Sequence, residues 1–394
     1  MWLFLLGVVG CALSVQGDVP LPAPFTEHCI VGETSEYPPD SSTKIPWFTI
    51  NLDLPPEQRW TEISTTYKEN IQELISVIKN LTLPFFHGKL IQWVDKHMGG
   101  WDDRLPSPYK EELVGIAKDT ESPLGEIVLY NVFYEIFTVC TSIVAEDPSG
   151  EIFHARNLDF GLFLGWDPKT HEWSVTERLR KMIVNIDFQR GGKTVYKTTN
   201  FAGYIGAFSA MKPQKFSVTL NERFALKGGY IGILKWLFSG KNDTHWATFF
   251  ARDVMEKANS YDEAFQMFQS QPMMSPIYVI LGGVNSGEGA IITRDLAKTL
   301  NVVQMNISQP NGWYVLQTNY DPWKAPLFID DRRTPGNKCM VQLGRAGTGF
   351  EGLYNVLSSK TTLNKLTAYT TLMHTSAGEM EAYTRVCPDP CWAF

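Results

Sequence analysis

The N-terminal third of the chain has a helical hydrophobic pattern. From about residue 55 to residue 137, apolar residues recur at steps of three and four. On a helix they would share one face, and this stripe consists of Trp60, Ile63, Tyr67, Ile71, Leu74 and Ile78. Shorter amphipathic segments follow at 90–94 and 109–116. Ser122 and Pro123 suit an N-cap and a first helical position, so another helix is expected over the apolar residues that follow.

After Cys140 the period of the pattern changes to two, which is typical of strands. The segments "CTSIVAED" (140–147) and "EIFHARNLD" (151–159) flank "PSG" and predict an antiparallel hairpin. Further strands are expected at 182–188, 194–198, 216–220, 277–281, 289–294, 313–318 and 368–373. Helices are expected at 230–238, 246–258 and 261–268, the last with Ser260 and Glu263 as a capping box. The glycine-rich "LGGVNSGEGA" (281–290) lacks the ending of a phosphate-binding loop and predicts a hairpin turn.

The beginning of the chain indicates entry into the secretory pathway. Residues 1–17 are apolar and end in small residues, as in a cleaved signal peptide. No later segment reaches 18 apolar residues without a charge, so we expect a soluble, lumenal or extracellular protein. Acceptor sequons for glycosylation at Asn80, Asn242 and Asn306 fit that compartment. The net charge of −7 argues against a nucleic-acid partner and weakly favours an acidic compartment.

The cysteine count makes Cys140 unusual. Without Cys11 of the leader, five cysteines remain, so one thiol is unpaired or bonded to another molecule in an oxidising compartment. The prolines of "CPDPC" favour a turn that would join Cys387 to Cys391. Cys29 and Cys339 would then pair at long range and leave Cys140 free. Sequence alone leaves the other pairings among these four cysteines open.

A hairpin with an odd loop, for instance residues 147–149, would place Cys140 opposite Arg156 on one face. A guanidinium that close would stabilise a thiolate. Asp159 follows near the expected strand end and would hold Arg156 in an ion pair. Other interpretations stay open: a buried inert cysteine, an ordinary surface ion pair, or a cysteine–histidine dyad in which His154 is the nearest base.

The segment "CTSIVAEDPSGEIFHARNLDFGLFLGW" resembles the start of the β subunit in the acid ceramidase family of N-terminal-nucleophile cysteine amidases. "PWFTINLDLPP", "FAGYIGAF", "LNERF", "GAIITRD", "QTNYDPWK", "DDRRTP" and "CPDPC" resemble that family too, over nearly the whole chain. The resemblance implies that the precursor cuts itself between Val139 and Cys140. Cleavage would create an α-amino group on Cys140 itself, with a reference pKa of about 7.7–8.0, and would supply the base that no histidine motif supplies.

The same resemblance assigns roles to the other site residues. Arg156 and Asp159 would orient the amine and thiol of Cys140, and Asn319 would donate to the oxyanion. Arg332 and Glu222 would lie near the same centre. Each has a plain alternative: Asn319 as a turn cap, Arg332 as a partner of Asp330 or Asp331, and Glu222 as a solvated side chain. Large apolar residues would line a lipid channel or form a core strand: Phe160, Leu162, Phe163, Leu164 and Trp166.

The expected fold is therefore α+β, with an αββα four-layer sandwich of the N-terminal-nucleophile hydrolases. We expect a helical α subunit over 18–139 and a catalytic β subunit over 140–394, linked by a disulfide. The resemblance implies lysosomal hydrolysis of ceramide, assisted by saposin-type activators and anionic membranes, with helices of the α subunit over the channel before cleavage. No cofactor or metal is expected, because no cluster has ligand spacing. An N-acylethanolamine amidase and a non-catalytic lipid-binding glycoprotein are the alternatives.

Overall fold

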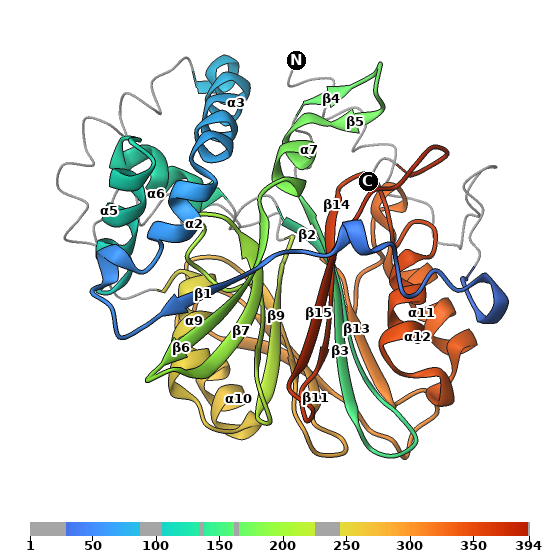
Figure 1. Ribbon diagram of the computed structural model, residues 1–394. Helices are drawn as coiled ribbons and strands as arrows, with labels where there is room; N and C mark the ends of the chain where they lie inside the picture. The colour runs from blue at the N-terminus through green and yellow to red at the C-terminus, as the bar shows by residue number, and fades with distance from the viewer. Residues whose placement is uncertain (1–28, 87–104, 134–137, 161–164, 225–244, 393–394) are drawn as a thin grey trace.

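Two stacked β-sheets form the centre of the molecule (Figure 1). The computed structural model describes residues 29–86, 105–133, 138–160, 165–224 and 245–392, without the side chains of 80–86 and 132–133. The larger sheet has the order β1-β6-β7-β8-β9-β10-β11-β12. Its strands are β1 (Trp47–Asn51), β6 (Ile183–Arg190), β7 (Lys193–Phe201), β8 (Ser209–Lys212), β9 (Phe216–Glu222), β10 (Ile277–Gly282), β11 (Gly289–Arg294) and β12 (Thr299–Gln304). Among the described strands of this sheet, β1 alone pairs with its neighbour, β6, in parallel, and the other pairs are antiparallel.

The smaller sheet is antiparallel and has the order β13-β2-β3-β14-β15. Its strands are β2 (Thr138–Glu146), β3 (Ile152–Phe160), β13 (Tyr314–Gln317), β14 (Thr367–His374) and β15 (Glu379–Thr384). Every residue of β2 is buried. A strand buried on both faces needs a layer on each side, which here are the larger sheet and a pair of helices. Cys140 therefore lies in the interior of the sandwich.

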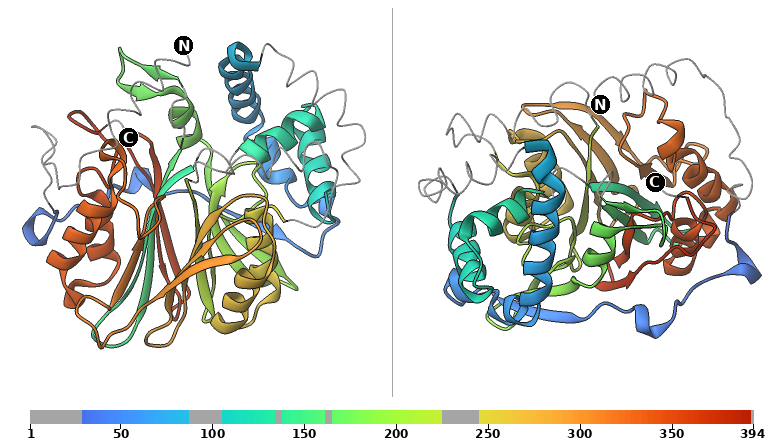
Figure 2. Two further views of the ribbon diagram at one scale, coloured as in Figure 1. Left: turned by 180° about the vertical axis from the view of Figure 1, so that it is seen from behind. Right: turned by 90° about the horizontal axis from the view of Figure 1, so that it is seen from above.

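Helices cover the outer face of each sheet and complete four layers (Figures 1 and 2). Helices α9 (Ala247–Lys257) and α10 (Tyr261–Ser270) pack on the larger sheet. Helices α11 (Arg333–Leu343) and α12 (Phe350–Ser358) pack on the smaller sheet. The expected αββα architecture is confirmed. Among the described residues, no helix is both long and apolar enough to cross a bilayer.

The N-terminal region adds a helical layer at one end of the sandwich (Figure 2). It consists of α2 (Thr61–Thr66), α3 (Lys68–Phe86), α5 (Tyr109–Asp119) and α6 (Leu124–Phe133). The predicted stripe is confirmed: Trp60, Ile63, Ile71, Leu74 and Ile78 are buried, and Tyr67 packs against them. A short hairpin, β4 (Trp166–Asp167) and β5 (Glu172–Trp173), precedes α7 (Ser174–Arg180).

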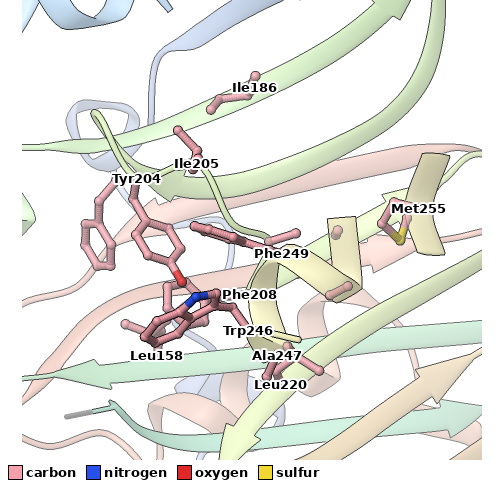
Figure 3. Close-up of a cluster of buried hydrophobic side chains, with 14 of the residues drawn as sticks. Leu158, Ile186, Tyr204, Ile205, Phe208, Leu220, Trp246, Ala247, Phe249 and Met255 are labelled. Carbon is pink, nitrogen blue, oxygen red and sulfur yellow. The ribbon is translucent and has the colours of Figure 1, made fainter. Parts of the chain in front are cut away.

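One large hydrophobic cluster joins these layers (Figure 3). Leu158 of β3, Leu220 of β9 and Phe249 of α9 belong to it, together with side chains of the N-terminal helices. A second cluster fills the space between the smaller sheet and α11 and α12, and includes Leu353, Leu357 and Leu372. Burial of apolar surface thus fixes β2 and β3 from both sides, and these strands carry the candidate site.

Most predicted elements are confirmed, with ends shifted by a few residues. The "LGGVNSGEGA" segment is the β10–β11 turn. Ser260 caps α10 by accepting from the Glu263 N–H, but the Glu263 carboxylate accepts from Asn259, so the reciprocal half of the capping box is wrong. The segments 90–94 and 230–238 lie outside the described residues, as do 1–17 and Asn242. Asn306 is exposed, whereas Asn80 is described only as part of the α3 backbone.

Both expected disulfides are present. Cys29 pairs with Cys339 at an S–S distance of 2.07 Å, and Cys387 pairs with Cys391 at 2.08 Å. The first bond ties the N-terminal arm to α11. Within the described part of the chain, Cys140 is the free cysteine, and it is buried.

Candidate active site

Cys140 lies near the start of β2, directly opposite Leu158 of β3. The predicted register, with Cys140 opposite Arg156, is wrong. The hairpin loop spans residues 147–151 rather than three residues, because the Asp147 carboxylate accepts from the N–H groups of Ser149 and Glu151. Five is still an odd number, so Cys140 and Arg156 share a face of the sheet as diagonal neighbours.

Arg156 contacts the Cys140 thiol directly. Its Nη2 lies 2.6 Å from Sγ, and the guanidinium also donates to the carbonyl oxygens of Phe208 and Leu220 and to Ser209 Oγ. Arg156 is fully buried. Burial raises the pKa of the Cys140 thiol, and Arg156 acts in the opposite direction. In the continuous chain the sulfur is therefore a thiol whose anion would be stabilised by an adjacent cation.

Asn319 follows the end of β13 and holds the backbone nitrogen of Cys140. Its Oδ1 accepts from the Cys140 N–H at 2.8 Å and from Arg332 Nη2 at 2.9 Å. Its Nδ2 donates to the carbonyl oxygen of Glu222 at 2.7 Å. With two donors on the oxygen and an acceptor at the nitrogen, the orientation of the amide is fixed.

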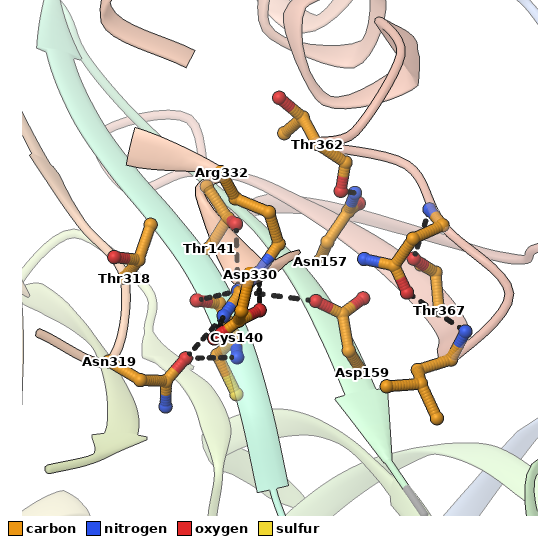
Figure 4. Close-up of polar contacts among 12 residues, drawn as sticks. Cys140, Thr141, Asn157, Asp159, Thr318, Asn319, Asp330, Arg332, Thr362 and Thr367 are labelled. Atoms are coloured by element: carbon orange, nitrogen blue, oxygen red, sulfur yellow. Dashed lines mark hydrogen bonds and ion pairs between the residues drawn. The ribbon is translucent and has the colours of Figure 1, made fainter. Parts of the chain in front are cut away.

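Arg332 stands at the N-terminus of α11 and connects the remaining groups (Figure 4). Its Nη1 donates to the Cys140 carbonyl oxygen at 2.5 Å and lies 3.4 Å from Asp159 Oδ2. Its Nε donates to Asp330 at 2.9 Å. Arg332 therefore pairs with Asp330, as one interpretation of the sequence expected, and it also contacts Cys140. Arg332 is fully buried.

Asp159 does not pair with Arg156, so that part of the prediction is wrong. In β3 the two residues are three positions apart and point to opposite faces of the sheet. Asp159 lies across from Val139 on the face where Arg332 lies. Burial raises the pKa of Asp159 to about 6, and the nearby Arg332 opposes this shift. Its carboxyl group therefore titrates in mildly acid solution.

The structure gives two other candidates different positions. The described contact of Glu222 with the site is made by its backbone oxygen, which accepts from Asn319. His154 is fully buried between Ser217 Oγ and Thr219 Oγ1, and burial lowers its pKa to about 3. A neutral imidazole bound to two hydroxyl groups is not placed as the base of a cysteine–histidine dyad.

The expected substrate-channel residues are described only in part. Phe160 ends β3, is fully buried and packs edge-on against Phe201 at 6.3 Å. Trp166 is 38% exposed and packs against Trp173. Leu162, Phe163 and Leu164 lie outside the described residues.

The sequence analysis missed residues that support the site. Thr141 contacts Arg332, and Ser209 contacts Arg156. Arg223 and Asp321 form a buried bidentate pair at 2.6 and 2.9 Å. In the sequence, Arg223 directly follows Glu222, and Asp321 lies two residues after Asn319. The hydroxyl groups of Thr141 and Ser209 left no signal in the sequence.

Comparison with known proteins agrees with this geometry. The family model for linear amide C–N hydrolases, choloylglycine hydrolase family, matches residues 140–349. The model for the beta subunit of N-acylethanolamine-hydrolyzing acid amidase matches residues 43–105. Acid ceramidase of Homo sapiens is 46% identical over 391 residues, which cover 98% of this chain and 96% of that protein. The Mus musculus acid ceramidase is 47% identical over 98% of this chain and 97% of that protein.

A solved structure supports the same relationship. The Caenorhabditis elegans N-acylethanolamine-hydrolyzing acid amidase ortholog superposes with a TM-score of 0.53 at 31% identity, covering 63% of this chain and all of that chain. The fold, the buried cysteine and the matched family model define a hydrolase of linear amides. Within this class, the chain belongs to the acid ceramidase family. This membership argues against the alternative of a non-catalytic lipid-binding glycoprotein.

Proposed function

We propose that the chain cuts itself between Val139 and Cys140 and then hydrolyses the amide bond of ceramide to sphingosine and a free fatty acid. One observation carries the proposal: three side chains hold three atoms of Cys140. Arg156 contacts Sγ, Asn319 accepts from the nitrogen and Arg332 donates to the carbonyl oxygen. The match to the linear amide hydrolase model also begins at residue 140, which would be the new N-terminus.

In the cleavage step, Cys140 Sγ bonds to the carbonyl carbon of Val139. The thiol proton passes to the Cys140 nitrogen, the C–N bond breaks, and a thioester and a free amine result. Water then hydrolyses the thioester, which leaves a carboxylate on Val139 and restores the thiol. A helical α subunit of residues 18–139 and a catalytic β subunit of residues 140–394 would be the products.

In turnover, the new α-amine takes the thiol proton and Sγ attacks the ceramide carbonyl carbon. Asn319 Nδ2 would donate to the oxyanion, while Arg156 stabilises the thiolate. Asp159 and Arg332 would orient the amine, and the Glu222 backbone would orient Asn319. The amine proton passes to the leaving sphingosine nitrogen, and water hydrolyses the acyl thioester to the fatty acid. The apolar segment from Phe160 to Trp166 would receive a lipid chain, since each buried methylene contributes about 0.8 kcal/mol.

The proposed setting is the lysosome, with saposin-type lipid-binding proteins and anionic membranes presenting the substrate. The relatives named acid ceramidase and the acidic composition support this setting. Asp159, whose pKa lies near 6, would change its charge over the pH range of such a compartment.

N-acylethanolamines are the second candidate substrates. The matched amidase model and the nematode amidase structure favour them. Turnover of ceramide and N-palmitoylethanolamine by one purified, cleaved preparation separates the two functions. A higher kcat/KM for ceramide is expected, and a higher kcat/KM for N-palmitoylethanolamine would overturn the assignment of substrate.

A further inference from the structure

A buried ion cluster joins the region before Cys140 to the region after it. Glu112 of α5 is fully buried and both of its oxygens are bound. Its Oε1 accepts from Arg252 Nη2 at 2.7 Å and from Arg59 Nη1 at 3.1 Å. Its Oε2 accepts from Arg252 Nη1 at 2.5 Å and from the Trp60 indole at 2.8 Å. Each carboxylate oxygen thus has two donors, which satisfies an ionised group without water.

Arg252 comes from the other side of the proposed cut. It lies in α9 and is fully buried, and its guanidinium carbon lies 5.3 Å from the Tyr109 ring centroid and 5.0 Å from the Phe188 ring centroid. Its Nη1 also donates to the carbonyl oxygen of Ile205. The Tyr109 hydroxyl also contacts α9. It lies within hydrogen-bond distance of the Phe249 carbonyl oxygen and of the Asp253 carboxylate.

A buried charge is strongly unfavourable unless its partner is in place. If α5 left α9, Arg252 would lose both bonds to Glu112. Glu112 would keep only Arg59 and Trp60, which lie on its own side of the cut. The Cys29–Cys339 disulfide tethers the N-terminal arm to α11, at a different place from the α5–α9 contact. The disulfide therefore does not by itself hold α5 on α9.

We infer that the Glu112–Arg252 pair is a noncovalent joint that keeps α5 docked on α9 after cleavage, in addition to the pairing of β1 with β6. The inference depends on the proposed cleavage at Val139–Cys140. It means that the helical region is part of the working enzyme and stays docked at α5. Any opening of the site would then come from other parts of that region.

The test compares Glu112→Gln, Arg252→Met and the double variant with Glu121→Gln as the control. Glu121 is an exposed carboxylate whose partner Lys68 lies on the same side of the cut, so its removal should change little. Intact mass first records whether each preparation is cleaved. Cleaved protein is then reduced and run on size exclusion, and amide hydrogen exchange is measured over α5 and α9.

The reduced wild-type fragments are expected to elute together. Each single variant should speed exchange in α5 by about 10-fold or more, because a buried charge loses its closest partner and keeps only a more distant one: Glu256 for Arg252, and Arg59 for Glu112. In the double variant, amide exchange in α5 should be slower than the sum of the two single effects predicts, since both charges of the pair have been removed.

Separation of the wild-type fragments on reduction alone would overturn the inference. An amide exchange rate in α5 of Glu112→Gln within twofold of the rate in Glu121→Gln would also overturn it. Failure of the double variant to fold when a single variant folds would also contradict it. An uncut wild-type chain would contradict the proposed function instead. Exchange in that uncut chain would still decide whether the pair holds α5 on α9.

Discussion

Arg332 Nη2 donates to Asn319 Oδ1 at 2.9 Å, and the same oxygen accepts from the Cys140 N–H. The amide of Asn319 is therefore turned so that its nitrogen faces away from Arg332, towards the Glu222 carbonyl oxygen. An amide fixed in this way needs little reorganisation when charge develops on a nearby oxygen. This relationship makes Asn319 a specific target for mutation.

Asn319→Asp keeps an acceptor for the Cys140 nitrogen but removes the Nδ2 donor. We expect kcat for ceramide to fall by about 10²–10³, the usual loss for one oxyanion donor. Thermal unfolding of the same preparation serves as the folding control. A kcat within about threefold of the wild type, with unchanged stability, would show that Asn319 does not stabilise the oxyanion.

Arg156→Lys should slow self-cleavage by about 10²-fold or more, because a lysine cannot reproduce the planar array of donors to Sγ, Phe208 and Leu220. The time course of cleavage on reducing gels measures the effect. Arg190→Lys is the matched control, since Arg190 pairs with Glu256 and is half exposed. Equal cleavage rates for the two variants would contradict a role of Arg156 at the thiol.

Asp159 should make stability depend on pH in a definite direction. Its folded pKa of about 6 lies above the ordinary aspartate value of 3.8, so the folded state binds an extra proton between these two pH values. This contribution to stability is fully present below about pH 4 and is lost as the pH rises through about 6. In a Cys140→Ala background, Asp159→Asn should therefore gain stability relative to its parent between pH 4 and pH 7, by about 3 kcal/mol at most.

Urea unfolding of that pair of proteins at several pH values provides the measurement. A stability difference that does not vary with pH, or that shifts in favour of the parent as the pH rises, would contradict the raised pKa. The two proteins share all other titrating groups, so the contributions of those groups to the pH dependence of stability largely cancel in the difference.

The Arg223–Asp321 pair should position Asn319 without touching the substrate. It joins the end of β9 to the segment that follows Asn319, and the Tyr278 hydroxyl donates to the same carboxylate. Arg223→Lys loses the bidentate geometry, and we expect kcat to fall by about 10-fold or more with little change in KM. Lys324→Met, which removes an exposed partner of Asp321, should change neither. Equal effects of the two substitutions would contradict the positioning role.

The hairpin that carries Cys140 was predictable because its alternation and its "PSG" turn are local signals. Its register was not, since the Asp147 side chain lengthens the loop. The pairing of Asp159 with Arg332 joins residues that are 173 positions apart, and no local pattern predicts it. Glu112 shows the same limit: a glutamate is rarely fully buried unless it is paired, and only the fold brings Arg252 to it.

The central claim is that cleavage of one peptide bond creates the nucleophile and its base on the same residue. N-terminal sequencing of the reduced protein after incubation in acid tests it directly. Two fragments are expected, one of which begins Cys-Thr-Ser-Ile, and Cys140→Ala should give a single uncut, inactive chain. Ceramide hydrolysis by a wild-type chain that remains uncut, or by a processed Cys140→Ala protein, would contradict it.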